Sequence, residues 1–246
     1  MQQLPHGFRT RSTGVSLASR PVSSLVIVAF VVLLLISAGA APVYSQWELG
    51  ASAGAGLSVL NGEDWRNDLA FDNAEEHPAP GVRAALDAGY RFLPWLAGRL
   101  SFSALRAASR YDYIDELDGE THEYDGSLVW WSGGPGAHVE LRIPLTPVEP
   151  FLSVGAIGAF PLSRFVRKDI SEDVSIVRRV AAERAIALHV AGMTGVRVPA
   201  GAITVLIGAH YERSLTGYFE TSGWPRLYAN VITLNAGVEI PLEGAR

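Results

Sequence analysis

Charged side chains occupy alternate positions within several apolar segments of the chain. They comprise five acids, five arginines and three histidines: Glu48, Asp87, Glu140, Glu212, Glu239, Arg83, Arg91, Arg99, Arg142, Arg197, His138, His189 and His210. An arginine guanidinium can bind a carboxylate through two parallel hydrogen bonds, and a histidine beside a carboxylate can act as a general base. These residues could therefore form a network of ion pairs, or a proton-transferring pair such as His210 and Glu212.

Other charged residues gather in three connecting segments. Residues 61–80 and 112–127 are strongly acidic, whereas residues 163–182 carry five basic side chains. Carboxylates are calcium ligands, but their spacing matches no EF-hand loop, so we predict solvated acidic loops and no metal site. The chain has no cysteine, which excludes thiol catalysis and Cys-ligated zinc. Residues 133–136 are glycine-rich but lack the Lys-Ser of a phosphate-binding loop, so no cofactor is predicted.

The first 45 residues have the pattern of a secretory signal peptide. They contain three arginines and no acidic residue, and the apolar run at residues 25–36 is followed by the small residues 37–41, which lead to Val43, Tyr44 and Ser45. Twelve helical residues span about 18 Å, less than the roughly 30 Å of a bilayer core. We predict cleavage after Ser45, with Ala40 or Ala41 as alternative sites, and a mature domain of residues 46–246. The other interpretation is an uncleaved amino-terminal anchor.

The composition excludes two classes of protein. Apolar residues make up 48% of the chain and charged residues 18%, which does not favour a disordered chain. The net charge is -5, and no basic stretch is suited to a phosphate backbone, so a nucleic-acid partner is not expected.

A period of two dominates the rest of the chain. From Trp47, odd positions are apolar and even positions are polar or small, and this alternation recurs in seven further segments. Successive side chains of a strand face opposite sides, so each segment predicts a strand with one apolar face. The predicted strands cover residues 47–59, 82–92, 96–104, 129–143, 152–162, 186–198, 203–211 and 228–240. The alternation breaks near Leu105 and Arg106, which predicts a β-bulge there.

The connections between these strands are alternately long and short. The long ones are 61–80, 112–127, 163–182 and 216–226, and the short ones contain turn-forming proline or glycine. All the long connections therefore lie at one end. An exported chain with an even number of strands and this asymmetry is typical of an outer-membrane β-barrel.

The charged residues indicate which face of each strand points inward. A soluble barrel would place its apolar face inside, but it would have no need for balanced charges at strand centres. A closed eight-stranded interior leaves little room for water, so every charge inside it needs a partner. Five acids against five arginines is the balance that pairing requires. We therefore predict an interior ion-pair network that largely closes the lumen, with the three histidines hydrogen-bonded within it.

Aromatic side chains on the apolar face lie mostly near the predicted strand ends. They are Trp47, Tyr90, Phe92, Trp131, Phe160, Tyr211 and Tyr228. Aromatic girdles at the two membrane interfaces are typical of transmembrane barrels. A soluble core would contain such rings at least as often in the middle of its strands.

On these repeats and loop lengths, residues 46–242 resemble the small outer-membrane β-barrel superfamily, which includes the OmpA-type transmembrane domains and OmpX. The resemblance implies an all-β, eight-stranded antiparallel up-and-down barrel in the bacterial outer membrane. It also implies contact with outer-membrane lipid and lipopolysaccharide.

The function predicted from the sequence is a structural or surface-interaction role for a monomeric barrel. The three longest connections could bind a surface ligand. One alternative is a narrow pore for ions or small solutes, and another is an enzyme that modifies lipid A. Lipid chemistry needs a nucleophile and a base reachable from the bilayer, whereas all three strand histidines face inward. We therefore predict no catalytic residue and no enzymatic activity.

Overall fold

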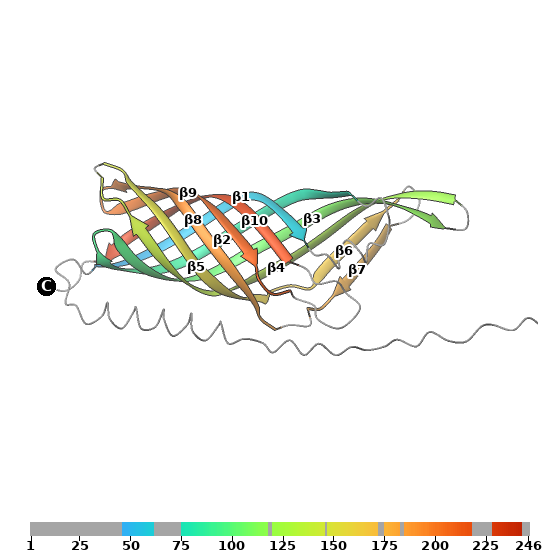
Figure 1. Cartoon of the computed structure of the whole chain (residues 1–246), viewed down its shortest axis with the longest axis horizontal. Coiled ribbons are helices and arrows are strands. Elements are labelled where there is room, and N and C mark those ends of the chain that lie inside the picture. Colours follow the sequence, from blue (N-terminus) through green and yellow to red (C-terminus); the bar gives the residue numbers. More distant parts are fainter. Residues whose placement is uncertain are drawn as a thin grey trace, which may run out of the picture. The chain divides into compact units, whose positions relative to one another are not determined.

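The computed structural model describes residues 46–61, 75–117, 120–145, 147–171, 175–182, 185–217 and 228–242. Ten strands account for nearly all of them (Figure 1). They are β1 (Gln46–Asn61), β2 (Glu75–Leu93), β3 (Leu96–Leu117), β4 (Glu120–Arg142), β5 (Glu149–Pro161), β6 (Phe165–Ile170), β7 (Ser175–Val180), β8 (Ala187–Ala200), β9 (Ile203–Ser214) and β10 (Tyr228–Leu242). No helix in these ranges is long and apolar enough to cross a membrane.

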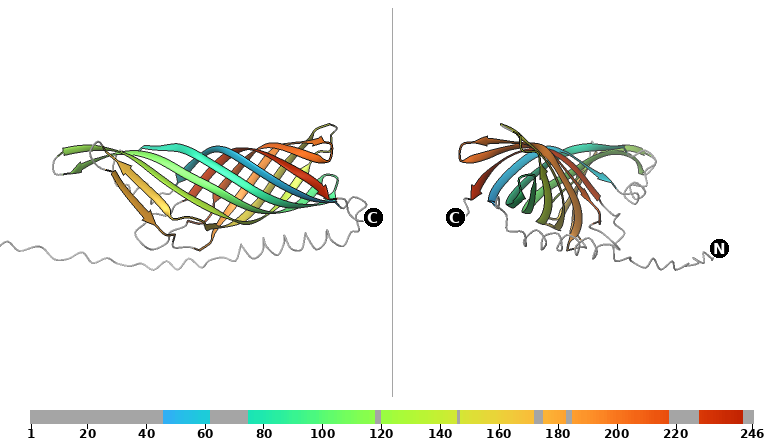
Figure 2. Two further views of the ribbon diagram at one scale, coloured as in Figure 1. Left: turned by 180° about the vertical axis from the view of Figure 1, so that it is seen from behind. Right: turned by 60° about the vertical axis from the view of Figure 1, so that its left-hand side comes forward.

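Eight of the strands close into a ring. The pairing runs β3-β2-β1-β10-β9-β8-β5-β4, and β4 pairs with β3 to complete the circle. Every pairing is antiparallel, and the strands are tilted in the same sense around the barrel (Figure 2). The predicted eight-stranded antiparallel barrel is confirmed.

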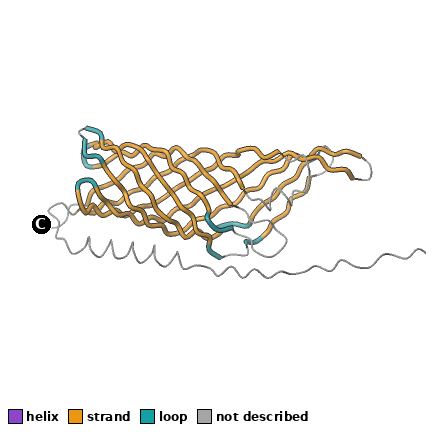
Figure 3. The backbone as a smooth tube through the Cα atoms, viewed as in Figure 1, coloured by secondary structure: helices purple, strands orange, loops and turns teal. Residues whose placement is uncertain are grey.

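Three short connections lie at one end of the barrel, called the turn end below (Figure 3). Pro94 and Trp95 join β2 to β3, and residues 143–148 join β4 to β5. Gly201 and Ala202 join β8 to β9, and Gly201 has a φ of 70°, which glycine adopts without a steric penalty. β1 begins at this end and β10 finishes there, since Trp47 pairs with Leu242. The predicted alternation of short and long connections is thus confirmed for these three turns.

Two segments predicted as loops are largely strands. β3 and β4 continue through residues 112–127 as a hairpin paired out to Leu117 and Glu120. Residues 163–182 contain the β6–β7 hairpin, in which β6 pairs with β4 over Asp125–Val129. Acidic and basic residues hid the period of two, because a strand that continues beyond a membrane into water needs no apolar outer face. We call this end of the barrel, opposite the turn end, the hairpin end.

Part of the long connection predicted at residues 61–80 is also strand. The last six residues of the predicted loop 61–80 belong to β2, which begins at Glu75. Residues 62–74 lie outside the described residues, as does the predicted signal peptide at residues 1–45.

The predicted irregularity near Leu105 and Arg106 is present, but the extra residue lies on β2 and not on β3. The register between β2 and β3 shifts by one between the pairs Val82–Arg106 and Pro78–Ser109, whereas the ladder between β3 and β4 is unbroken. Because of this shift, the backbone of Ala108 pairs with no residue of β2. The Ser58 hydroxyl of β1 binds this backbone instead. Ser58 Oγ donates to the Ala108 carbonyl at 2.5 Å and accepts from the Ala108 amide at 2.8 Å.

Candidate functional site in the barrel interior

The ring has an apolar outer surface and a charged interior, the reverse of a water-soluble protein. Leu86, Leu100 and Leu234 are 66%, 64% and 73% exposed, whereas Glu140 and Arg197 are each 2% exposed. A closed ring pairs its backbone groups between strands, so this exterior can face hydrocarbon without unsatisfied polar groups. The chain is therefore built as a transmembrane β-barrel.

The aromatic residues of the predicted girdle all lie on the outward face or are partly exposed. Trp47, Trp131 and Tyr211 are exposed, and the other four are half-buried. The rings of Trp47 and Tyr90 contact each other, with centroids 4.9 Å apart. Trp95, which is 51% exposed, was not predicted as part of the girdle because it lies in a turn rather than in a strand.

Eight charged side chains form what we call the ionic cluster, near the turn end of the interior. They are Glu48, Arg91, Arg99, Glu140, Arg142, Glu149, Arg197 and Glu239. With four glutamates and four arginines, the cluster is electrically balanced. A balanced set is the arrangement that offsets the cost of burying these charges.

Glu48 receives hydrogen bonds from three arginines of the ionic cluster. Arg142 binds it in a bidentate manner, with Nη1 donating to Oε1 at 2.8 Å and Nη2 donating to Oε2 at 2.6 Å. Arg91 and Arg197 each donate a longer bond, at 3.3 Å. The paired donors of Arg142 satisfy both carboxylate oxygens in a planar geometry that a lysine could not reproduce.

Glu140 is the second centre of the ionic cluster. Arg142 Nε donates to its Oε1 at 2.6 Å, and Arg197 Nη1 lies 3.1 Å from the same oxygen. Arg99 Nε lies 2.6 Å from Oε2. Arg99 and Arg197 also contact Glu239, so each of these two guanidinium groups joins two or more carboxylates.

Glu149 was not predicted as an interior residue because it was assigned to the turn 144–149. It is the first residue of β5 and faces the interior, like Phe151 and Ser153 after it. Its carboxylate lies 3.1 Å from Arg197 Nε and 3.4 Å from Arg91 Nη2. Its inward phase relative to Ser153 was the signal that could have identified it.

The other predicted interior residues lie farther from the turn end, in what we call the histidine cluster. Its members are Arg83, Asp87, His138, His189, His210 and Glu212. His189 Nδ1 lies 2.7 Å from Glu212 Oε1, and His138 Nε2 lies 3.0 Å from the Ser101 hydroxyl. Of the ten residues predicted to form one network, Arg83, Asp87 and Glu212 therefore lie outside the ionic cluster.

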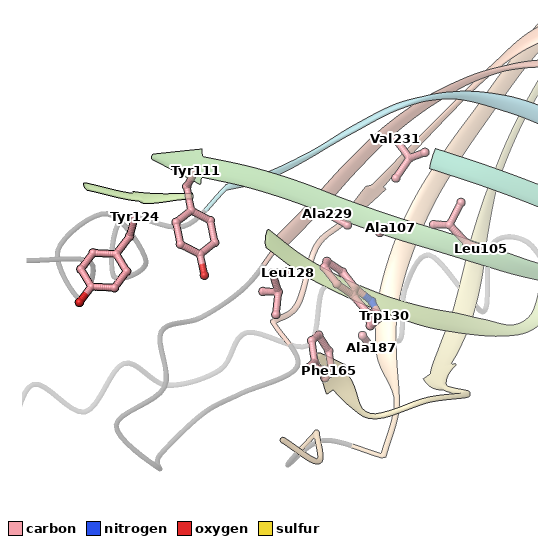
Figure 4. Packing of buried hydrophobic residues seen from close by; sticks show 10 residues of the cluster. All are labelled: Leu105, Ala107, Tyr111, Tyr124, Leu128, Trp130, Phe165, Ala187, Ala229 and Val231. Carbon is pink, nitrogen blue, oxygen red and sulfur yellow. The ribbon is translucent and has the colours of Figure 1, made fainter. Parts of the chain in front are cut away.

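An apolar cluster, which was not predicted from the sequence, fills the interior near the hairpin end (Figure 4). It consists of Leu105, Ala107, Tyr111, Tyr124, Leu128, Trp130, Phe165, Ala187, Ala229 and Val231. The rings of Trp130 and Phe165 stack with centroids 4.9 Å apart. The alternation breaks at Leu105 because the inward face changes there from polar to apolar.

A polar contact attaches the β6–β7 hairpin to this apolar cluster. The Tyr111 hydroxyl donates to Asp169 Oδ1 at 2.8 Å, and Arg167 Nε donates to the same carboxylate. The Arg167 guanidinium also lies 5.6 Å from the centroid of the Tyr111 ring. Tyr111 of β3 is therefore held by two residues of β6.

In the described ranges, no group of three or more His, Asp or Glu side chains is arranged to hold a metal ion. A closed ring of eight antiparallel strands, apolar outside and charged inside, has the architecture of the small outer-membrane β-barrel proteins.

Comparison with solved structures gives likenesses of low sequence identity. Neisserial surface protein A is 13% identical, with 80% of this chain and 98% of that chain covered and a TM-score of 0.40. Ail of Yersinia pestis, in complex with the heparin analogue sucrose octasulfate, is 18% identical, with 79% and 99% covered and a TM-score of 0.37. The N-terminal β-barrel domain of Pseudomonas aeruginosa OprF is 11% identical, with 81% and 100% covered and a TM-score of 0.34. The chain matches no protein-family model and no curated protein.

Proposed function

We propose that this protein is a structural or surface-interaction barrel of the outer membrane, with a lumen closed by the ionic cluster. The observation that carries the proposal is that its ion pairs join strands across the ring. Glu48 of β1 binds Arg142 of β4, and Arg99 of β3 binds Glu239 of β10. Each of these pairs joins strands three places apart in the ring. Side chains that meet across an eight-stranded interior leave little room for solute.

Conductance in planar lipid bilayers tests closure and separates it from the alternative of a narrow pore. The wild-type barrel is expected to show no steady conductance, whereas the double variant Glu48→Ala/Arg142→Ala is expected to show discrete current steps. A matched control is Arg110→Ala/Glu123→Ala, which removes one arginine and one glutamate with exposed side chains. Steady current through the wild-type protein would overturn the proposal and favour the pore.

The surface role belongs to the hairpin end, where charged side chains are exposed. Lys168, Arg178 and Arg179 are exposed on β6 and β7, and Asp112 and Asp125 are exposed on β3 and β4. Basic groups there suit phosphate groups of lipopolysaccharide, and the whole end suits a surface ligand of mixed charge. The proposal assigns a monomeric state and no catalytic residue. Unchanged lipid A masses on overexpression, together with a monomer in detergent, are the expected results.

Residues 1–45 are assigned to a signal peptide in the same proposal. Amino-terminal sequencing of the protein from the membrane fraction is expected to begin at Gln46. A mature protein that still carried the apolar run at residues 25–36 would instead support the uncleaved anchor.

A further inference from the structure

The ladder between β4 and β5 has a gap, which we call the β4–β5 gap. Six of the eight strand pairings that close the ring run without interruption through the described residues. Between β4 and β5, Gly133 pairs with Phe160 and Gly136 pairs with Ile157, but the two positions between these pairs are unpaired. The register is the same on both sides, so the gap is a loss of hydrogen bonding and not a β-bulge.

A proline in β4 accounts for the β4–β5 gap. Pro135 lies opposite Gly158 in this register, and a proline has no amide hydrogen to donate. The pairing of Pro135 with Phe102 of β3 is intact, so the missing donor is the one that would point towards β5. The Gly158 carbonyl therefore lacks the bond from residue 135, in a wall that faces hydrocarbon and where an unsatisfied backbone group is costly.

The residues beside the β4–β5 gap cannot replace this hydrogen bond. At the register shift between β2 and β3, the Ser58 hydroxyl binds the unpaired backbone of Ala108. The neighbours of the β4–β5 gap have no polar side chain, since they are Gly134, Gly136, Ile157 and Ala159. The β4–β5 gap is therefore a weak point in the barrel wall that no adjacent side chain repairs.

Both faces of the wall are apolar at this point. Ile157 and Ala159 face the interior, are each 1% exposed, and form a small apolar cluster with Ala191. On the outer face, the rings of Phe102 and Phe160 lie with centroids 6.2 Å apart. Separating β4 from β5 here would bring apolar groups into contact with lipid. The same separation beside the ionic cluster would bring charged groups into contact with hydrocarbon, at a far higher cost.

We propose that the barrel wall opens locally at the β4–β5 gap and that the end of a lipid acyl chain enters the opening and contacts Ile157 and Ala159. An acyl chain matches the site because it is apolar and forms no hydrogen bonds. The ionic cluster stays in place, since Glu140 pairs with Ser153 in the uninterrupted part of the same ladder. The inference therefore goes beyond the proposed closure of the lumen to ions and does not depend on it.

Nuclear magnetic resonance of the protein in phospholipid nanodiscs tests the proposal. Acyl-chain protons should give nuclear Overhauser effects to the methyl groups of Ile157 and Ala159. Val231 is the control, because it is 0% exposed in the interior and both ladders of β10 are uninterrupted, so it should show no such effect. No effect at Ile157 would overturn the proposal. Equal effects at Ile157 and Val231 would also overturn it, and steady conductance of the same protein would then show that the proposed closure of the lumen fails as well.

Two substitutions separate the missing donor from the glycine content of the β4–β5 gap. Pro135→Ala supplies an amide, so the lipid effect at Ile157 should disappear. Exchange of the flanking Ala137 and Phe160 amides should slow at least about fivefold, the factor that corresponds to about 1 kcal/mol for one hydrogen bond. Gly158→Ala is the matched control, because the donor is still missing and a Cβ there meets no atom closer than 3.9 Å. Unchanged exchange in Pro135→Ala, or equal slowing in Gly158→Ala, would overturn the proposal.

Discussion

Glu48 and Arg142 come from strands that are not neighbours in the ring, yet both carboxylate oxygens of one accept from both terminal nitrogens of the other. Glu48 lies near the start of β1 and Arg142 ends β4, so the pair ties the first strand of the barrel to a strand three places away in the ring. Both side chains are buried. Removing either one leaves its partner buried with an incomplete set of counter-charges.

Glu48→Ala and Arg142→Ala are each expected to lower the free energy of unfolding by about 3 to 5 kcal/mol, as for other broken buried ion pairs. Urea unfolding in lipid vesicles measures this, and heat-modifiable migration on gels gives a quick check. The exposed Glu123→Ala and Arg110→Ala serve as controls and should stay within about 0.5 kcal/mol of the wild type. Equal effects of buried and exposed substitutions would contradict the assignment of these residues to the interior.

Arg91→Ala is expected to cost less than Arg142→Ala, although both arginines contact Glu48. The Arg91 side chain is 23% exposed, and its contacts to Glu48 and Glu149 are 3.3 and 3.4 Å long. Water can replace part of its interaction, so we expect a loss below about 1 kcal/mol in the same urea titration. A loss as large as that of Arg142→Ala would mean that Arg91 is buried as deeply as the rest of the ionic cluster.

The eight-stranded ring was predictable because lipid and lumen impose opposite demands on successive residues. Where both demands act, as from Val82 to Tyr90 on β2, the period of two is visible in the sequence. Where one of these two demands is absent, the period of two is no longer visible in the sequence. From Leu105 towards the hairpin end the interior is apolar, and the outer face carries Arg106 and Arg110. A continuous strand therefore resembles a break in the pattern.

The inward phase of a charge could be predicted, but not its partner. Arg99 meets Glu239, which is 140 residues away, because three strand pairings bring them together, and a strand period carries no information about such contacts. The separation of Arg83 and Asp87 from the ionic cluster has the same origin. It depends on the stagger of neighbouring strands, which only the register determines.

Tyr111→Phe is expected to loosen the β6–β7 hairpin without unfolding the barrel. The substitution removes the hydroxyl that donates to Asp169, and a hydrogen bond to a charged group contributes about 1.5 to 3 kcal/mol. If that energy holds the hairpin locally, trypsin should cleave at Lys168 and Arg178 at least about tenfold faster, since about 1.4 kcal/mol corresponds to a factor of ten. Tyr211→Phe is the matched control, because its hydroxyl donates to Asn230 at an exposed site. Equal cleavage rates in both variants would show that Tyr111 does not hold the hairpin.

Trp130 and Trp131 are consecutive tryptophans with opposite environments, and they provide a direct test of the apolar cluster. Trp130 is 1% exposed and stacks on Phe165, whereas Trp131 is 40% exposed on the outer face. Trp130→Ala should therefore lower the free energy of unfolding by about 3 to 5 kcal/mol through the cavity that it leaves.

Trp131→Ala creates no interior cavity, and its effect in detergent micelles should be markedly smaller than that of Trp130→Ala. Urea titrations of both variants under identical conditions measure the difference. Phe165→Ala should resemble Trp130→Ala, because it removes the other ring of the same stack. If Trp131→Ala proved the more damaging of the neighbouring substitutions, the inward and outward faces of β4 would be exchanged, and the apolar cluster could not fill the interior at the hairpin end.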